Sequence, residues 1–310
     1  MKIVDKDKFI NIHSKDNSPA ITIEPKEDII LTVLGGAGNQ LDMEKLGVQK
    51  LDLNTFNDDI SLPSAGPVAV TGSLPGDSLS LEIKDISFDK TGWIAYWPGI
   101  HKIPIPIELK KEPYSYIVPI RDNMIIFSDE ISIPVKPMIG AIGITPADYT
   151  FQTTEASSIY GGNMDIKDIT IGSIIYLPVF IPGGLFSLGD LHASMGDGEV
   201  GGSGVECGGK VRLRVDLIKN ARLFGPIVET SESWCTVGVN KSFEKAAEIA
   251  IRTAIELIHK ETGWERDKIS MLISCVADLK ICQMVGRSIS VRLAISKDIV
   301  SLKLFSREIE

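Results

Sequence analysis

The sequence predicts a mainly β protein, an antiparallel sandwich or barrel, that ends in an α+β part carrying one long amphipathic helix. Short apolar segments punctuated by proline and glycine fill residues 63–137, and the same style continues to residue 240. After residue 240, apolar residues fall three to four positions apart. Many short strands at close spacing are typical of antiparallel β folds, whereas the later period indicates a helix. At 310 residues the chain is long enough to bury a sizeable core.

The first sixty residues contain two expected strands and a loop. Residues 20–23 and 29–33 are short β-branched runs between charged turns, which is typical of strands. Residues 35–38 read Gly-Gly-Ala-Gly and suggest a nucleotide-binding loop. The third glycine of that fingerprint would fall at Leu41, and no Gly-Lys-Ser/Thr follows, so the pattern argues against a phosphate site. Residues 41–60 are expected to form a loop with one helical turn.

Residues 63–137 are expected to form much of the antiparallel body. The expected strands are 68–70, 78–83, 103–107, 124–127 and 131–135. Asp77 closes a Pro-Gly-Asp turn, and a turn role is far more common there than metal binding. Trp93, Tyr96 and Trp97 form an aromatic cluster with His101. We expect this cluster to pack in the core, and the other interpretation is a loop that walls a substrate pocket.

The last part of the chain combines further strands with two helices. Strands are expected at 169–175, 177–181, 211–217, 236–239, 288–295 and 299–304. Apolar residues recur from Phe243 to Ile258, between a Ser242 N-cap and Gly263, which predicts an amphipathic helix of about five turns. A second helix is expected from Asp267 to Val276. We expect two closely packed lobes, a β-rich lobe at 1–140 and a second at 141–310 that joins a β segment to the α+β part.

Charge and cysteine content narrow the class of protein. The formal net charge of −9 argues against nucleic acid or an anionic membrane as the main partner, because both need a basic face. The chain shows neither an apolar stretch of signal-peptide length nor one of membrane-span length, so we expect a cytoplasmic protein. The four cysteines have no CxxC spacing, and we expect them to be reduced and buried.

The chemistry concentrates in residues 183–209, which hold ten of the 28 glycines. Such a density of glycine disfavours helix and permits tight turns and close approach to a ligand. Two pairs of polar residues stand two apart within it, Asp190 with His192 and Asp197 with Glu199, and alternate residues of a strand share a face. Carboxylates with an imidazole are a good ligand set for zinc or a similar divalent metal. The alternative is a turn aspartate with a hydrogen-bonded histidine.

The third metal ligand, the substrate contacts and the general base are assigned from where each residue stands in the glycine-rich segments. Asp165, at the end of a Gly-Gly-Asn-Met-Asp turn, is the third expected metal ligand, and the alternative is an ordinary strand-entry turn. We expect Gly162 and Asn163 to contact substrate. Glu199 and Glu206 compete for the role of general base, and we prefer Glu199 because it stands among glycines where substrate can approach.

Other histidines and two nucleophiles are weaker candidates. His13 and His259 fit a polar loop and a helix C-terminus, and His101 is the histidine most able to join the site. Ser203 stands between glycines as in amidase-signature enzymes, but the second serine and the lysine of that set are missing. Cys207 has only a carboxylate beside it, which supports a thiolate poorly.

Three motifs give the chain a resemblance to the acetamidase/formamidase family. The segment 161–206 resembles the family's GGNMD segment and its GDLHA and GDGE run. Residues 66–77 resemble its GP-x-x-V-x-G-x-x-PGD turn, and residues 137–146 resemble its PFMGVIG-x-x-P strand. One position departs from the pattern, because Met195 stands where family members commonly have glutamine.

The resemblance implies an amidohydrolase that splits small aliphatic amides such as formamide or acetamide into carboxylate and ammonia. Asp165, Asp190 and His192 would hold a divalent metal, zinc first and calcium second, in the lobe at 141–310, and activated water would attack the amide. We also expect a homo-oligomer, a dimer or larger. The alternatives are a non-catalytic β-sandwich stabilised by calcium, against which His192 counts, and a serine-nucleophile amidase that uses Ser203.

Overall fold

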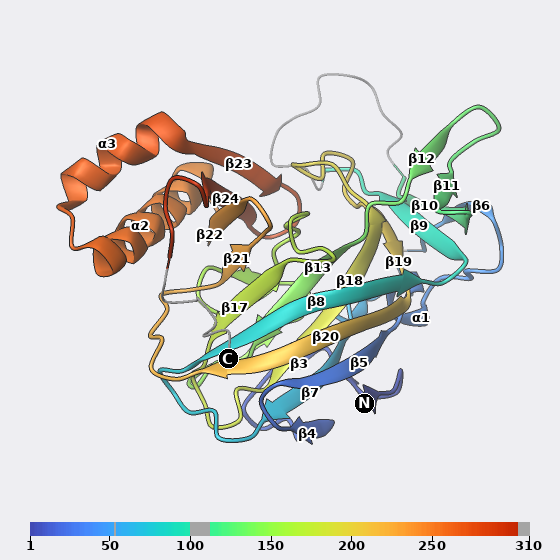
Figure 1. The fold of residues 1–310 in the computed structure, drawn as a ribbon. Helices are drawn as coiled ribbons and strands as arrows, with labels where there is room; N and C mark the ends of the chain where they lie inside the picture. The colour runs from blue at the N-terminus through green and yellow to red at the C-terminus, as the bar shows by residue number, and fades with distance from the viewer. Residues whose placement is uncertain (53, 100–111, 303–310) are drawn as a thin grey trace.

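The structure is a computed structural model, and it describes residues 1–52, 54–99 and 112–302. Two large, mostly antiparallel sheets stack face to face, and two helices cover one end (Figure 1). The predicted mainly β fold with one long C-terminal helix is thus confirmed. Within the described residues, no helix combines the length and the apolar character that crossing a membrane requires.

The first sheet has nine strands within the described residues. In spatial order they are β1 (Lys2–Val4), β5 (Glu27–Val33), β20 (Gly209–Ile218), β8 (Ser78–Phe88), β17 (Ile174–Pro178), β21 (Ile227–Glu229), β22 (Ser233–Asn240), β24 (Ile289–Ser296) and β23 (Ala277–Gln283). Only β1 and β5 are parallel neighbours. The last three strands extend beyond the sandwich and carry the helices.

The second sheet has thirteen strands and carries most of the polar residues predicted for the site. Its main path is β12 (Ser132–Pro134), β11 (Met124–Ile126), β10 (Tyr114–Arg121), β9 (Thr91–Tyr96), β19 (Val205–Cys207), β18 (Phe186–Ser194), β13 (Met138–Ile144), β16 (Gly161–Asn163) and β15 (Ala156–Ser157). Off this path lie β7 (Ser64–Val70), β2 (Phe9–Ile10), β4 (Ile21–Ile23) and β6 (Gly47–Lys50). A separate pair joins β3 (Ile12–His13) to β14 (Phe151–Gln152).

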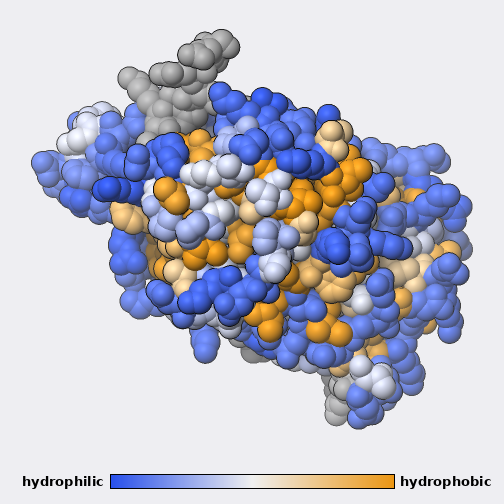
Figure 2. Space-filling view, turned by 90° about the horizontal axis from the view of Figure 1, so that it is seen from below, coloured by the Kyte–Doolittle hydropathy of each residue, from blue (hydrophilic) through white to orange (hydrophobic). Residues whose placement is uncertain are grey.

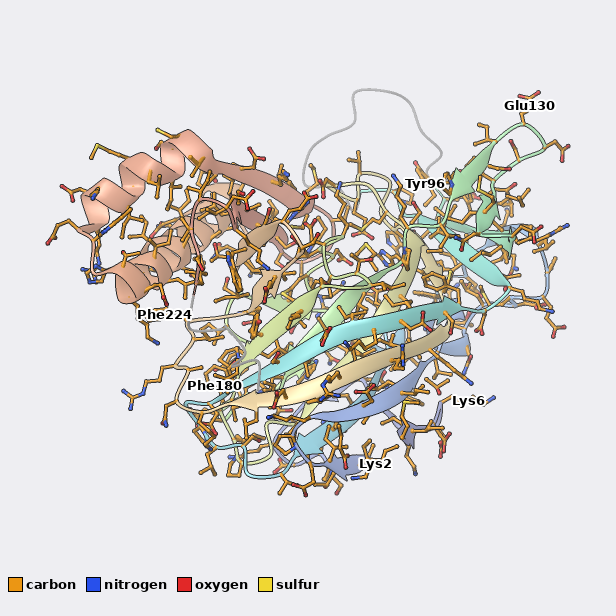
Figure 3. All side chains as sticks on the ribbon, in the orientation of Figure 1. Lys2, Lys6, Tyr96, Glu130, Phe180 and Phe224 are labelled. Carbon is orange, nitrogen blue, oxygen red and sulfur yellow. The ribbon has the colours of Figure 1, made fainter. Side chains whose placement is uncertain are left out.

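The main core lies between the two sheets because each strand turns its apolar side inward. On β20, Val211, Leu213 and Val215 are fully buried, and the intervening Lys210 and Arg212 are exposed. Residues of β13, β18 and β7 face them from the second sheet in the same apolar cluster. Peripheral side chains point outward, as Glu130 does at the tip of the β11–β12 hairpin (Figure 3).

The helices behave as their sequence predicts. α2 (Phe243–Thr262) begins at Ser242, whose side chain accepts a hydrogen bond from the Lys245 N–H, and ends at a left-handed Gly263. Its buried alanines pack on β22 and β24. α3 (Arg266–Val276) follows and packs on α2. The shortest helical pieces are α1 (Gly36–Asn39) and the single 3-10 turn η1 (Asp58–Ile60).

Several predicted elements differ from the structure. The strands outside the expected ranges include β1, β6, β9, β10, β21 and β23, and the two strands expected at 169–175 and 177–181 are one strand, β17, preceded by a turn. The final strand expected at 299–304 is absent from its described residues, 299–302. The strand expected at 103–107 lies outside the described residues.

Two predictions about single residues are also wrong. His13 is not in a polar loop, because it is buried in β3 and stacks on Phe151 with ring centroids 4.3 Å apart. Cys275 is exposed, whereas Cys207, Cys235 and Cys282 are buried as expected, and all four are free thiols.

The boundary at residue 140 does not separate the two sheets. Each sheet takes strands from both sides of it, so the division into lobes stays a prediction.

One face of the molecule shows apolar residues gathered in its middle with polar residues around them (Figure 2).

Candidate active site

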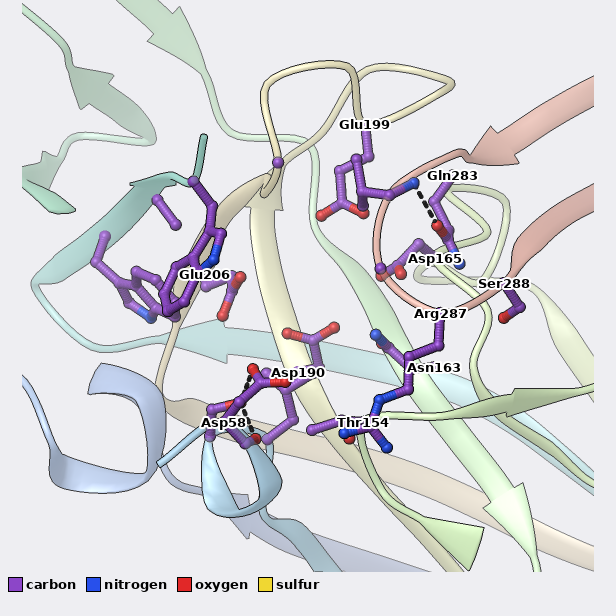
Figure 4. A pocket seen from close by; sticks show the side chains of 18 of the residues that line it. Asp58, Thr154, Asn163, Asp165, Asp190, Glu199, Glu206, Gln283, Arg287 and Ser288 are labelled. Atoms are coloured by element: carbon purple, nitrogen blue, oxygen red, sulfur yellow. Dashed lines mark hydrogen bonds between the residues drawn. The ribbon is translucent and has the colours of Figure 1, made fainter. Parts of the chain in front are cut away.

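The polar residues predicted for the site meet at one cavity of about 360 Å³ (Figure 4). Asp165, Asp190, Glu199 and Glu206 line it together with Asn163. An apolar wall of Phe56, Leu62, Trp93, Ala95, Trp97 and Pro98 completes it. A concave site with an apolar wall and a few convergent polar groups is the usual form of a small-molecule site.

Two strands of the second sheet bring the metal-ligand candidates together. Asp190 and His192 lie two apart on β18, and His192 Nε2 is 3.2 Å from Asp190 Oδ1. Asp165 follows β16, on the other side of β13. A Cβ at Gly140 of β13 would lie 2.4 Å from Asp190 Oδ2 and 2.6 Å from Asp165 Oδ1. The two carboxylates therefore approach each other beside Gly140, which has no side chain to separate them.

The backbone turns sharply at three of the carboxylates. The φ angles of Asp165, Asp190 and Glu199 are 51°, 53° and 46°. This left-handed region is costly for residues other than glycine, and it persists where the surrounding structure enforces it, often at functional sites.

Glu206 reaches the cluster from the neighbouring strand. In the antiparallel register of β18 with β19, Glu206 stands directly opposite His192. Directly opposed residues share a face of the sheet at close range. His192, Glu199 and Glu206 form a second group whose ligand atoms lie within 4.8 Å of one another, beside the group of Asp165, Asp190 and His192.

Glu199 enters from the loop that joins β18 to β19. Its Oε1 accepts a hydrogen bond of 3.0 Å from the Gly204 N–H, which fixes the carboxyl toward the cavity. Asp197 does not join it, contrary to the pairing expected from the sequence. The carboxylate of Asp197 binds Arg292 through both oxygens, at 2.9 and 3.2 Å, and Lys167 at 2.9 Å.

Burial and like charge dominate the electrostatics of the cluster. Burial, followed by the Asp190 carboxylate, raises the pKa of Asp165 to about 8. Burial and the neighbouring carboxylates also raise the pKa values of Glu199 and Glu206 well above their usual range. For His192, burial has the largest single effect and lowers the pKa, but the charge and hydrogen bond of Asp190 together with the charge of Asp165 outweigh it, and the pKa is raised. The cluster therefore holds protons unless a cation compensates its charge.

The donor atoms suit a divalent cation. Asp165 Oδ1 and His192 Nδ1 are buried and have no hydrogen-bond partner among the residues that the structure describes, and such orphaned groups are uncommon in folded proteins. Asp165, Asp190 and His192 are 2%, 7% and 0% exposed. Carboxylate oxygens with one imidazole fit zinc, and the imidazole fits calcium poorly.

The other predicted residues have different places. Asn163 lines the cavity, whereas Gly162 is not among its lining residues and packs its backbone against Glu155. His101 lies outside the described residues. Ser203 Oγ accepts a hydrogen bond of 2.7 Å from the Ala95 N–H and donates to the Gly204 carbonyl. Burial raises the pKa of Cys207, so its thiol stays protonated.

Sequence reasoning missed one wall of the cavity. Thr154, Gln283, Arg287 and Ser288 line it, and Arg287 binds Asp59 and Glu155 at 3.0 Å each. These residues carry no local motif: Gln283, Arg287 and Ser288 come from the end of β23 and the turn that follows it, and Thr154 comes from the turn between β14 (Phe151–Gln152) and β15. Trp93 and Trp97 show that the aromatic cluster both packs and walls the cavity.

Comparison with known proteins points to one group. A family model described as the Acetamidase/Formamidase family matches residues 153–301. A curated acetamidase of Mycolicibacterium smegmatis is 55% identical over 60 residues, which cover 19% of this chain and only 15% of the length of that protein.

Two solved structures match over nearly the whole chain. A predicted acetamidase/formamidase of the thermophile Thermoanaerobacter tengcongensis has a TM-score of 0.89 and 36% identity, with 98% of each chain covered. An acetamidase of Bacillus halodurans has a TM-score of 0.89 and 28% identity, with 96% of this chain and 98% of that chain covered.

Proposed function

Because the chain belongs to the acetamidase/formamidase family, we propose that it is an amidohydrolase that splits small aliphatic amides such as formamide and acetamide into carboxylate and ammonia. The observation that carries the proposal is the buried group of four carboxyls and one imidazole at the cavity. Two of its atoms, Asp165 Oδ1 and His192 Nδ1, lack a partner within the described part of the chain. A group of this kind is suited to holding a cation and moving protons.

We propose that Asp165, Asp190 and His192 hold a divalent metal, with zinc the first candidate and calcium the second. When bound, such an ion supplies Lewis acidity, which polarises an amide carbonyl and acidifies water. His192 lies behind the carboxylates and outside the cavity lining, so it would serve the ion and leave substrate contacts to others.

Glu199 is the proposed general base. Its carboxyl is 6% exposed and oriented by the Gly204 N–H. A carboxyl whose pKa is raised can take a proton from attacking water and return it to the departing nitrogen near neutral pH. Glu206 is the alternative base.

The glycine loop offers fewer oxyanion donors than its composition suggests. The N–H groups of Gly198, Gly202 and Gly204 already donate to Cys282 O, Glu199 O and Glu199 Oε1. The side chain of Asn163 is a further candidate for contact with the amide, because it reaches the cavity and its Oδ1, which can accept the substrate N–H, has no partner among the described residues.

The test measures ammonia release from a panel of short amides, with metal content determined on the same preparation. We expect activity that disappears on chelation and returns with added metal. Bound calcium without activity toward any amide would support the calcium-stabilised sandwich instead.

A nucleophile mechanism predicts a different result. An acyl-enzyme would be intercepted by hydroxylamine as a hydroxamate, and Ser203→Ala or Cys207→Ala would abolish activity. We expect both variants to keep substantial activity, because Ser203 is engaged with the backbone and the Cys207 thiol is buried and protonated. An acyl adduct on either residue would overturn attack by water.

A further inference from the structure

Arg292 of β24 is a buried arginine with three separate partners. Its side chain is 2% exposed. It binds both oxygens of Asp197, forms an ion pair with Asp168, and lies 3.4 Å from Cys282 Sγ. Buried guanidinium groups are retained where a planar, multidentate geometry is needed.

The two carboxylates belong to the two segments that carry the site. Asp168 lies three residues after Asp165, and Asp197 lies two residues before Glu199. Lys167 adds a second link between these segments, because its ammonium is 2.9 Å from Asp197. Arg292 thus contacts both the segment that contains the proposed metal ligand Asp165 and the loop that contains the proposed base Glu199.

The β23–β24 hairpin holds the same two segments through further hydrogen bonds. Ser290 Oγ donates to the Met164 carbonyl at 2.6 Å, next to Asp165. The Gly198 N–H donates to the Cys282 carbonyl at 2.9 Å, and the Met284 N–H donates to the Gly198 carbonyl at 3.2 Å. Gly198, beside Glu199, forms a parallel β-bridge with Gln283 at the end of β23.

We propose that Arg292 is a positioning residue, which holds the Asp165 segment and the Glu199 loop at a fixed separation. The proposal rests on the proposed function, in which Asp165 binds metal and Glu199 moves the proton. Arg292 is not among the residues that line the cavity, so its effect passes through Asp168 and Asp197. A small displacement of a base costs turnover more than it costs substrate binding.

The variants are Arg292→Lys, which keeps the charge but cannot reach both carboxylates with a planar fork, and Asp197→Asn, which keeps the shape but loses the charge. The matched control is Arg266→Lys. Arg266 binds both oxygens of Glu256 at 2.7 Å on the exposed α2–α3 surface, and neither residue lines the cavity.

We expect kcat per metal-loaded site to fall about 10- to 100-fold in Arg292→Lys and Asp197→Asn, with KM within about threefold of wild type. Arg266→Lys should leave both unchanged. Wild-type kcat in folded Arg292→Lys and Asp197→Asn, or an equal loss in Arg266→Lys, would overturn the proposal.

Hydrogen–deuterium exchange separates this proposal from the amidase reaction itself. Peptides covering 195–204 should exchange faster in Arg292→Lys, on the order of tenfold, whereas peptides of α2 should not change. If wild type hydrolyses no amide, the proposed function fails and the exchange result alone decides the positioning role. Unchanged hydrogen exchange at 195–204 in both variants would contradict the positioning role of Arg292.

Discussion

Glu199 and Glu206 differ in how their carboxyls are held, although both are buried and both have raised pKa values. Glu206 is fixed in a strand opposite His192, whereas Glu199 comes from a loop and is oriented by one backbone N–H. A base that must accept and return a proton needs access to the reacting atoms, and the loop position gives that access. Glu206 is better placed to support the metal-binding group.

Glu199→Gln should keep metal but lose at least about 100-fold in kcat, the size of a general-base contribution. The glutamine Oε1 can still accept the Gly204 N–H, so the loop should keep its conformation. Steady-state kinetics and metal analysis of the same sample check this. If metal is lost with activity, Glu199 is a ligand and Glu206 becomes the better base.

His192→Ala should lose metal affinity by at least about tenfold and lose activity with it, while the protein stays folded. The imidazole is fully buried, and its Nδ1 has no partner in residues 1–52, 54–99 and 112–302. Elemental analysis and circular dichroism measure the two effects. The control is His259→Ala, because that ring lies in the last turn of α2, where it hydrogen-bonds the Trp264 carbonyl, and its loss should leave metal unchanged. Full metal and full activity in His192→Ala would remove His192 from the ligand set.

At the scale of elements, the sequence predicted those elements whose ends and faces are set by neighbouring residues. The Ser242 cap, the apolar period and Gly263 placed α2 to within one residue of its observed end. β23 was missed because four of its seven residues are polar or small and three in a row are exposed. It is a strand because β24 pairs with it, which is information from elsewhere in the chain.

The site residues also divide into those that local spacing predicted and those whose positions depend on distant parts of the chain. Asp190 and His192 were predicted because they lie two apart on one strand. The matching expectation for Asp197 and Glu199 failed, because the loop there is not extended and because Arg292, 95 residues away, takes the Asp197 carboxylate. Spacing predicts a shared face only while the segment remains a strand.

Gly140 of β13 provides a test of how strands build the site. A methyl group there would lie within 2.6 Å of Asp190 Oδ2 and of Asp165 Oδ1, so Gly140→Ala should push the carboxylates apart. We expect at least about tenfold weaker metal binding with the fold retained. Gly201→Ala is the control, because no atom lies within 4 Å of its Cβ position. Equal metal binding in the two variants would contradict this account of β13.

At the scale of the whole molecule, the interleaving of the sheets explains why the site is one unit. Residues of the β9 region, β16, β18, β19 and the end of β23 all reach the same cavity. Neither lobe predicted from the sequence holds this set alone. The homo-oligomer and the cytoplasmic location stay predictions, and the mass in solution, relative to 33.7 kDa for one chain, tests the first.

The cost of assembling the carboxyl cluster should appear in the stability of the whole metal-free protein. The folded-state pKa of Asp165 is about 8, against 3.8 for an unperturbed aspartate. Between these pH values the folded protein holds a proton that the unfolded chain has released. Stability therefore falls as pH rises through this window, and the raised pKa values of Glu199, Glu206 and His192 act in the same direction.

Asp165→Asn isolates this effect, because the carboxamide stays neutral at every pH. In the presence of chelator, we expect wild type and variant to have similar unfolding free energies near pH 4.5, and the variant to be more stable near pH 8 by on the order of 2 kcal/mol. Groups with lowered pKa values, such as Asp77, affect both proteins equally and cancel in the difference. Added zinc should reverse the order, since only wild type keeps the full ligand set. Denaturant unfolding at each pH measures the difference, and parallel curves for the two proteins would show that Asp165 is not protonated in the folded metal-free state.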